Sequence, residues 1–153
     1  MPSLHRDWTT AIPFITGSLR LQIVQNAAAR FLKRRNKFDH IMPLLRFLHW
    51  LPTQFRIEYK ILLLVYKSLN NLAPSYLTDL LHPYTPMREL RSEDKLLLEI
   101  PRTRLKTRGN RAFEVAGPTL WNNLPDPVRM ASSLSEFKSC LKTHLFSLAF
   151  VDV

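Results

Sequence analysis

A long apolar segment, residues 38–81, constrains the fold of this chain more than any other feature. Within it, residues 54–69 (QFRIEYKILLLVYKSL) are apolar around most of a helical circumference. Such a helix cannot lie on a surface with one broad face in water, so other segments must cover it. Pro52 suits its first turn and Asn70-Asn71 suits its end. The pattern predicts a central buried helix over about residues 52–71.

The segments on either side of this helix predict a mainly α fold. Ser18 is a suitable N-cap for a helix over SLRLQIVQNAAARFLKRR, and Ser133 with Glu136 forms a capping-box pattern before a last amphipathic helix. Only three glycines serve 153 residues, which disfavours an all-β fold. We expect an irregular lead-in over 1–17, a helical core over 18–82, a charged linker or loop over 83–95, and a basic ribbon with C-terminal helices over 96–153 that pack on the same core.

Three finer expectations concern the interior. Residues 95–101 (KLLLEIP) predict a strand of a short β ribbon near 95–113, with its partner within residues 104–113. The stretch RAFEVAGPTLWNNLP predicts a helix interrupted at Gly117-Pro118. Glu58 projects opposite to the cations of the central helix, and a structural ion pair with an arginine of another element explains it better than a catalytic role.

The charge balance favours a polyanionic partner. Lys and Arg total 22 against 12 Asp and Glu, a net charge of +10. Nucleic acid and an anionic membrane surface both fit this excess, and so does a merely solvated basic surface. The single cysteine, Cys140, excludes an internal disulfide framework and a Cys-rich zinc site, which is typical of an intracellular protein of the nucleus or cytoplasm. No apolar run approaches the roughly 20 residues of a spanning helix, so we expect no membrane partner.

Motifs of catalysis are absent from the sequence. The chain has no glycine-rich phosphate loop, no HExxH, no CxxC and no GxSxG. Its five histidines have no repeating spacing, and the only adjacent acidic pair, Glu93-Asp94, lies in the charged stretch without apolar flanks. We therefore expect no enzyme activity, no cofactor and no metal.

Three groups of cations are the better functional signal, because each could neutralise phosphates. The run over 102–111 contains no acidic residue, and four of its cations alternate with period two, which would place them on one face of an extended chain. Aromatic residues nearby either stack on bases or belong to the core: Phe31, Phe38, Trp50 and Tyr84. The predicted nucleic-acid contacts are Arg30, Lys33 and Arg34, then Arg56, Lys60 and Lys67, then Arg102, Arg104, Lys106, Arg108 and Arg111.

Several long stretches resemble a known family. LQIVQNAAARFL, then DHIMPLLRFLHWLPTQFRIEYKILLLVYKSLNNLAPSYLTDLL, then LRSEDKLLLEIPRTRLKTRGNRAFEVAGPTLWNNLP and SLSEFKSCLKTHLFSLAF closely resemble the carboxyl-terminal part of LINE-type (non-LTR) retrotransposon reverse transcriptases. The resemblance runs from about Leu19 to Phe150, and residues 1–18 do not share it.

The resemblance implies a binding role without catalysis. In that family an amino-terminal endonuclease and a central polymerase carry out the chemistry, and an aromatic-x-Asp-Asp motif binds magnesium. The present chain contains no such motif. Some relatives carry a Cys/His zinc knuckle, which one cysteine cannot form. What remains resembles the region that helps to grip template RNA or target DNA.

Two alternatives stay open beside nucleic-acid binding. The chain could be a docking domain whose apolar surface packed on the missing polymerase domains, with its cations serving solubility. It could also be an orphan reading frame without a selected function.

Overall fold

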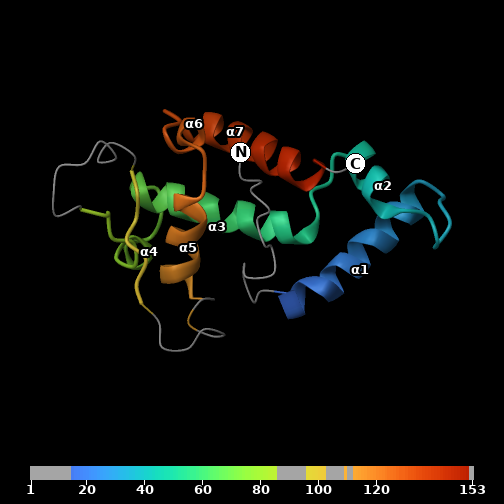
Figure 1. Ribbon diagram of the computed structural model, residues 1–153, viewed down its shortest axis with the longest axis horizontal. Helices are drawn as coiled ribbons and strands as arrows, with labels where there is room; N and C mark the ends of the chain where they lie inside the picture. Colours follow the sequence, from blue (N-terminus) through green and yellow to red (C-terminus); the bar gives the residue numbers. More distant parts are fainter. Residues whose placement is uncertain (1–14, 86–95, 103–108, 110–111, 152–153) are drawn as a thin grey trace, which may run out of the picture.

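The computed structural model describes residues 15–85, 96–102, 109 and 112–151, and these residues form seven helices. Among the described residues there is no strand, only one isolated bridge. The mainly α fold expected from the sequence is confirmed. In chain order the helices are α1 (Ile15–Leu32), α2 (Ile41–Phe47), α3 (Thr53–Leu69), α4 (Ser75–Thr78), α5 (Phe113–Asn122), α6 (Asp126–Arg129) and α7 (Leu134–Ala149) (Figure 1).

Helix α3 is the centre of the fold, as its sequence predicts. It packs against α1, α4, α5 and α7, and α7 runs alongside it (Figure 1). Pro52 precedes its first turn. At its end Asn71 adopts a left-handed φ of 56°, and the amide of Leu72 donates to the carbonyl of Lys67 over 2.7 Å. Asparagine tolerates this conformation, so the helix stops where the Asn pair predicts.

The main core lies between α3, α5 and α7. Phe137 of α7 is fully buried and stacks on Tyr66 of α3, with ring centroids 4.2 Å apart. Its ring also meets Trp121 of α5 at 5.9 Å. The hydroxyl of Tyr66 donates to the carbonyl of Ala131 over 3.1 Å, which satisfies the polar atom of this ring. Leu98 packs in the same cluster.

Helix α1 is attached to the rest by glutamines. The side chain of Gln25 donates to the carbonyl of Leu51 (2.8 Å) and accepts from the hydroxyl of Thr53 (3.1 Å). Gln22 accepts from the amide of Thr53 over 2.7 Å. Ala29 is the buried apolar residue of α1, in a small second cluster with Leu45 and Phe150. Because polar contacts hold α1 in place, most of its larger apolar side chains stay exposed.

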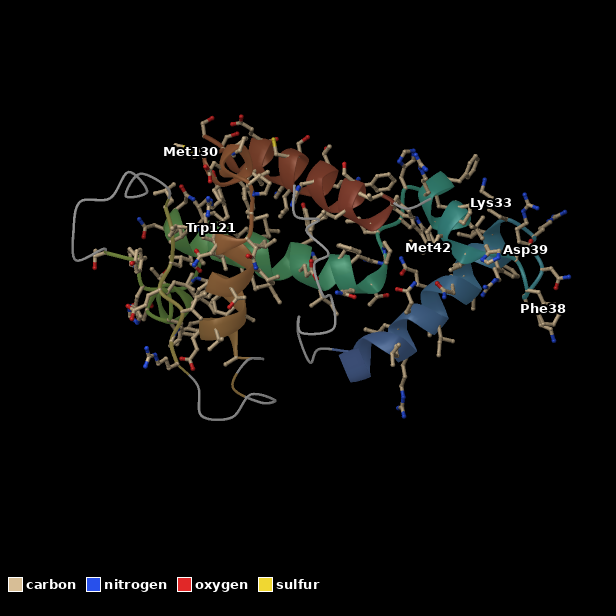
Figure 2. All side chains as sticks on the ribbon, viewed as in Figure 1. Lys33, Phe38, Asp39, Met42, Trp121 and Met130 are labelled. Carbon is tan, nitrogen blue, oxygen red and sulfur yellow. The ribbon has the colours of Figure 1, made fainter. Side chains whose placement is uncertain are left out.

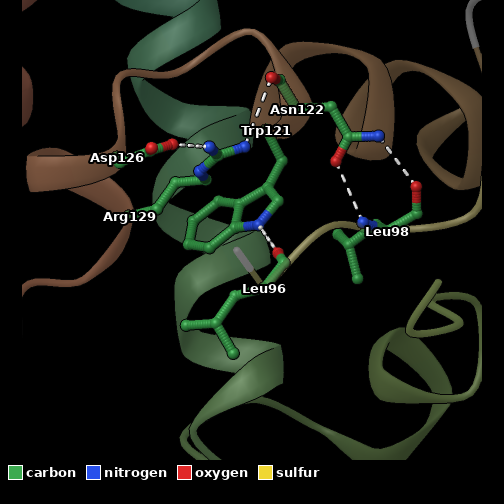
Figure 3. Close-up of polar contacts among 6 residues, drawn as sticks. All are labelled: Leu96, Leu98, Trp121, Asn122, Asp126 and Arg129. Atoms are coloured by element: carbon green, nitrogen blue, oxygen red, sulfur yellow. Dashed lines mark hydrogen bonds and ion pairs between the residues drawn. The ribbon is translucent and has the colours of Figure 1, made fainter. Parts of the chain in front are cut away.

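Of the β ribbon expected near 95–113, the structure describes residues 96–102, 109 and 112–113, and no strand is present among these. Leu98 bridges to Pro83 in antiparallel fashion, whereas the partner was expected within residues 104–113. Of those, 104–108 and 110–111 lie outside the described residues. On its other side the backbone of Leu98 is held by a side chain, since Asn122 accepts from its amide (2.9 Å) and donates to its carbonyl (2.8 Å) (Figure 3). An amide side chain thus occupies the place of a second strand.

Three local predictions need correction. Helix α1 begins at Ile15, so Ser18 is not its N-cap and residues 15–17 are not irregular. Helix α5 runs through Pro118 without the predicted interruption, because burial of Gly117 and Pro118 offsets the one missing hydrogen bond. At α7, the Ser133 hydroxyl accepts from the amide of Glu136 as expected. The Glu136 carboxylate, however, accepts from the amide and hydroxyl of Ser132.

Candidate nucleic-acid interface

The connection between α1 and α2 carries the first predicted group of cations, at one end of the molecule (Figure 2). The chain reverses after α1 because Arg34 adopts a left-handed φ of 48°. The amide of Arg34 donates to the carbonyl of Phe31 (3.2 Å), and that of Arg35 donates to the carbonyl of Arg30 (2.9 Å). These two bonds form a Schellman motif, which usually has glycine at this position. The motif turns the following residues outward, and residues 31–40 are all exposed.

Exposed aromatic rings accompany these cations. Phe38 is 80% exposed and Phe47 is 67% exposed. The Nζ atom of Lys33 lies 4.0 Å from the ring centroid of Phe47, and the Nζ atom of Lys37 lies 4.8 Å from that of Phe38. Lys33, Phe38 and Phe47 line a surface hollow of about 680 Å³. We call Lys33, Arg34, Lys37, Phe38 and Phe47 the loop cluster. Exposed rings beside cations suit unpaired bases and their phosphates.

Arg30 has a more structural position than its neighbours. Its Nη2 atom donates to the carbonyl of Asp39 over 3.2 Å, which ties the end of α1 to the start of α2. Its Nε atom is buried and has no hydrogen-bond partner among the described residues. Arg30 is therefore less accessible to a phosphate than Lys33 or Arg34, which are exposed.

Arg56 and Lys60 lie one helical turn apart on α3, and both are exposed. They line a second hollow, of about 550 Å³, together with Trp50. Lys142 of α7 lines it from another element, so three cations meet there. We call this site the α3 hollow; its lining contains no acidic residue and consists of Gln25, His49, Trp50, Leu51, Arg56, Tyr59, Lys60 and Lys142.

The remaining predicted cations are placed elsewhere or not described. Lys67 is half-buried and does not line the α3 hollow. Arg102 is exposed, but its segment lies at the opposite end of the longest axis from the loop cluster (Figure 1). Arg104, Lys106, Arg108 and Arg111 lie outside the described residues. The described cations thus form separate groups along the molecule and no single compact patch.

Burial shifts the pKa values of two neighbouring groups on α3. It raises the pKa of the Glu58 carboxyl, and a hydrogen bond of 3.4 Å from the Gln54 amide nitrogen offsets part of this effect. The arginine partner expected for Glu58 is not found among the residues that the structure describes. Burial also raises the pKa of the Tyr59 hydroxyl, so this group stays neutral in the α3 hollow.

The described part of the chain offers neither a metal site nor a membrane span. No group of three or more His, Cys, Asp or Glu side chains that could hold a metal ion is present there. Cys140 is a half-buried free thiol. No helix in the described ranges is both long and apolar enough to cross a bilayer.

Lys142, Tyr59 and Phe47 are site residues that the sequence analysis did not identify. Lys142 belongs to the polar face of an ordinary amphipathic helix, and only the packing of α7 on α3 brings it near Lys60. Phe47 follows an apolar run and is indistinguishable there from a core residue. Trp50, in contrast, was named in advance as a ring that stacks on bases or belongs to the core, and it lines one hollow with Arg56 and Lys60.

Comparisons with protein-family models, with curated proteins and with solved structures found no match.

Proposed function

We propose that this chain is a non-catalytic module that binds RNA or single-stranded DNA, chiefly through phosphates. The observation that carries the proposal is the loop cluster, in which Phe38 and Phe47 are exposed within 5 Å of lysine ammonium groups. Leaving two phenylalanine rings in water is unfavourable unless a ligand covers them. A base stacked on such a ring brings its phosphate within reach of the adjacent cation.

The α3 hollow supports the same function with a different geometry. Arg56, Lys60 and Lys142 enter it from two helices, and Trp50 supplies a ring. Because no lining residue is acidic, nothing in the lining neutralises these cations. Under this proposal the α3 hollow holds phosphates of the same RNA or DNA strand whose bases stack on the loop cluster.

The resemblance to the carboxyl-terminal part of LINE-type reverse transcriptases supports the proposal from the sequence. We propose that the chain is related to such a protein and corresponds to its gripping region. In this view the run Arg102, Arg104, Lys106 and Arg108 contacts phosphates as well, apart from the loop cluster.

A salt titration tests the proposal. Fluorescence anisotropy with labelled oligo(U) or oligo(dT) of about 20 nucleotides should show affinity that falls steeply with salt, by about 0.7 in the logarithmic slope per phosphate contact. Lys33→Glu with Lys37→Glu should weaken binding by about tenfold or more. The matched control, Arg20→Glu with Lys138→Glu, changes the net charge equally at exposed cations outside both sites.

Two results would overturn the proposal. One is an affinity that stays flat between low and high salt. The other is an equal loss in both double variants, which would mean that net charge alone attracts the strand. Charge reversal of Arg102, Arg104, Lys106 and Arg108 tests that run separately.

We propose docking of a protein partner as a second function, because of one observation on α1. Six of its large apolar side chains are exposed, and a concentration of exposed apolar side chains on one helix is typical of an interaction site. These side chains are Leu19, Leu21, Ile23, Val24, Phe31 and Leu32. A test is the binding of an apolar helical peptide, with Val24→Asp as the variant that should lose it.

A further inference from the structure

A groove of about 820 Å³ lies between α1, α3 and α5. Helix α1 contributes Leu21 and Val24, α3 contributes Ile57, Ile61 and Leu64, and α5 contributes Phe113. Its lining is mostly apolar. Two of the lining side chains are nevertheless exposed, Val24 by 66% and Leu64 by 39%. The described residues therefore leave apolar side chains from three helices facing one open hollow, and burying such surface is favourable.

The attachment of α1 explains why the groove is open. Gln22 and Gln25 bond to Leu51 and Thr53, at the start of α3. Ala29 packs near the other end of α1. The glutamine contacts fix α1 to the start of α3, the Ala29 cluster fixes it to α2, and α1 and α3 diverge from the glutamines (Figure 1). No other element of the described residues covers the apolar side chains between them.

The charge of the groove selects its occupant. Arg56 and Lys60 line it, and none of its lining residues is acidic. A second copy of this chain would bring a further net charge of +10 to the same place. Like charges oppose that association, whereas carboxylates beside an apolar face would pair with Arg56 and Lys60.

We propose that this groove binds an amphipathic helix of a partner protein, with an apolar face flanked by acidic side chains. The inference rests on the docking function proposed above and names the chemistry of its partner. Three helices form the walls, and the described residues offer no strand for an added strand to pair with. A helix placed there would present its i, i+3, i+4 and i+7 apolar side chains to Leu21, Val24, Ile61 and Leu64.

The experiment uses the full chain and three capped helical peptides of about 18 residues. All three carry the same leucine face, and the positions beside it are Glu, Gln or Lys. Isothermal titration should give the tightest binding for the Glu peptide, by about tenfold over the Gln peptide, and the weakest for the Lys peptide. Arg56→Glu with Lys60→Glu should reverse this order.

Matched variants separate the groove from general attraction. Val24→Asp should abolish binding of the Glu peptide, whereas Ile23→Asp should leave it within about twofold. The two positions are adjacent on α1 and are 66% and 67% exposed, but only Val24 lines the groove. Arg20→Glu with Lys138→Glu matches the charge change of the Arg56 and Lys60 variant outside the groove. Val24→Asn adds no charge beside Arg56 and Lys60, so it should weaken peptide binding and leave oligo(U) binding unchanged, and the nucleic-acid function is read separately.

Four outcomes would overturn the inference. If all three peptides bind equally and Val24→Asp abolishes binding, the groove binds a helix but does not select acidic side chains. If no peptide binds, docking in this groove fails as well. Self-association that Val24→Asp abolishes would make a second copy the occupant. Binding to phosphatidylserine vesicles that Val24→Asp abolishes, without peptide binding, would make the surface a lipid site.

Discussion

The indole nitrogen of Trp121 donates a hydrogen bond of 2.8 Å to the carbonyl oxygen of Leu96, which precedes it by 25 residues (Figure 3). The next residue, Asn122, holds both backbone polar groups of Leu98. Two consecutive residues at the end of α5 thus fix a short extended segment to the core. The segment needs no second neighbouring strand, because side chains satisfy the backbone groups that would otherwise be unpaired.

Asn122→Ala should destabilise the fold through this contact. The change leaves the amide and carbonyl of Leu98 without their partner at a buried position, so we expect a loss of about 2 kcal/mol in the free energy of unfolding. Urea denaturation followed by circular dichroism measures it. The neighbouring Asn123 is exposed, and Asn123→Ala should change stability by less than about 0.5 kcal/mol. Equal effects at the two positions would contradict the role of Asn122.

Gly117 permits the close approach of α5 to α3. A Cβ atom at this position would lie 3.0 Å from Cγ2 of Val65. Alanine gains about 1 kcal/mol of helix propensity over glycine, but overpacking in a core costs about 1–3 kcal/mol. We expect Gly117→Ala to lower the free energy of unfolding by about 1 kcal/mol. In a Val65→Ala background, which lacks the clashing Cγ2 atom, the same change should raise it by about 1 kcal/mol. A double-mutant cycle in urea tests this sign reversal, and its absence would refute the steric argument.

Some of the fold could be predicted because it depends on local sequence. The apolar circumference of residues 54–69 predicts the central helix, and Asn71 and Ser133 act at helix ends as their residue types indicate. The contact of Asn122 with Leu98 could not be predicted, because it joins side chain and backbone over 24 residues and has no periodic signature. The continuation of α5 through Gly117-Pro118 could not be predicted either, because it too depends on tertiary packing. Local rules favour a break there, and only burial overrides them.

The candidate site was predictable to a similar degree. Runs of cations are visible in a sequence, so Lys33, Arg34, Arg56 and Lys60 could be named in advance. Their exposure and their neighbours depend on how each helix is rotated in the fold. The rotation of α2 exposes Phe47, that of α7 brings Lys142 to Arg56 and Lys60, and the turn after α1 exposes Phe38.

Glu58→Gln should change how stability depends on pH. Burial raises the folded-state pKa of Glu58 above its ordinary value of 4.5, so the folded state favours the protonated carboxyl. The stability of the native protein should therefore fall as pH rises from 4.5 through the folded-state pKa, and this contribution stays constant above it. Glutamine is neutral throughout, so the variant should melt at a higher temperature at pH 7, and the difference should vanish below pH 4.5. Calorimetry across this range measures it.

Glu136 provides a control of opposite sign. Hydrogen bonds from the hydroxyl and amide of Ser132 lower the pKa of Glu136 below 4.5. Its contribution to stability is present above 4.5 and is lost as pH falls through the folded-state pKa. Glu136→Gln should therefore be less stable than the native protein at pH 7. If both glutamine variants shift stability in the same direction, burial is not what distinguishes Glu58.

Lys142→Glu should weaken RNA binding through the α3 hollow, although no sequence motif marks this residue. Lys142 lines the hollow with Arg56, Lys60 and Trp50, whereas Lys138 lies one turn earlier on α7, is equally exposed and does not line it. Both charge reversals change the net charge by the same amount, so long-range attraction is affected alike. We expect Lys142→Glu to reduce the affinity for oligo(U) about fivefold or more and to lower the salt slope by about 0.7, as for one lost phosphate contact. Lys138→Glu should change affinity by less than about twofold. Indistinguishable salt slopes in the two variants would remove the α3 hollow from the binding surface and leave the loop cluster as its described part.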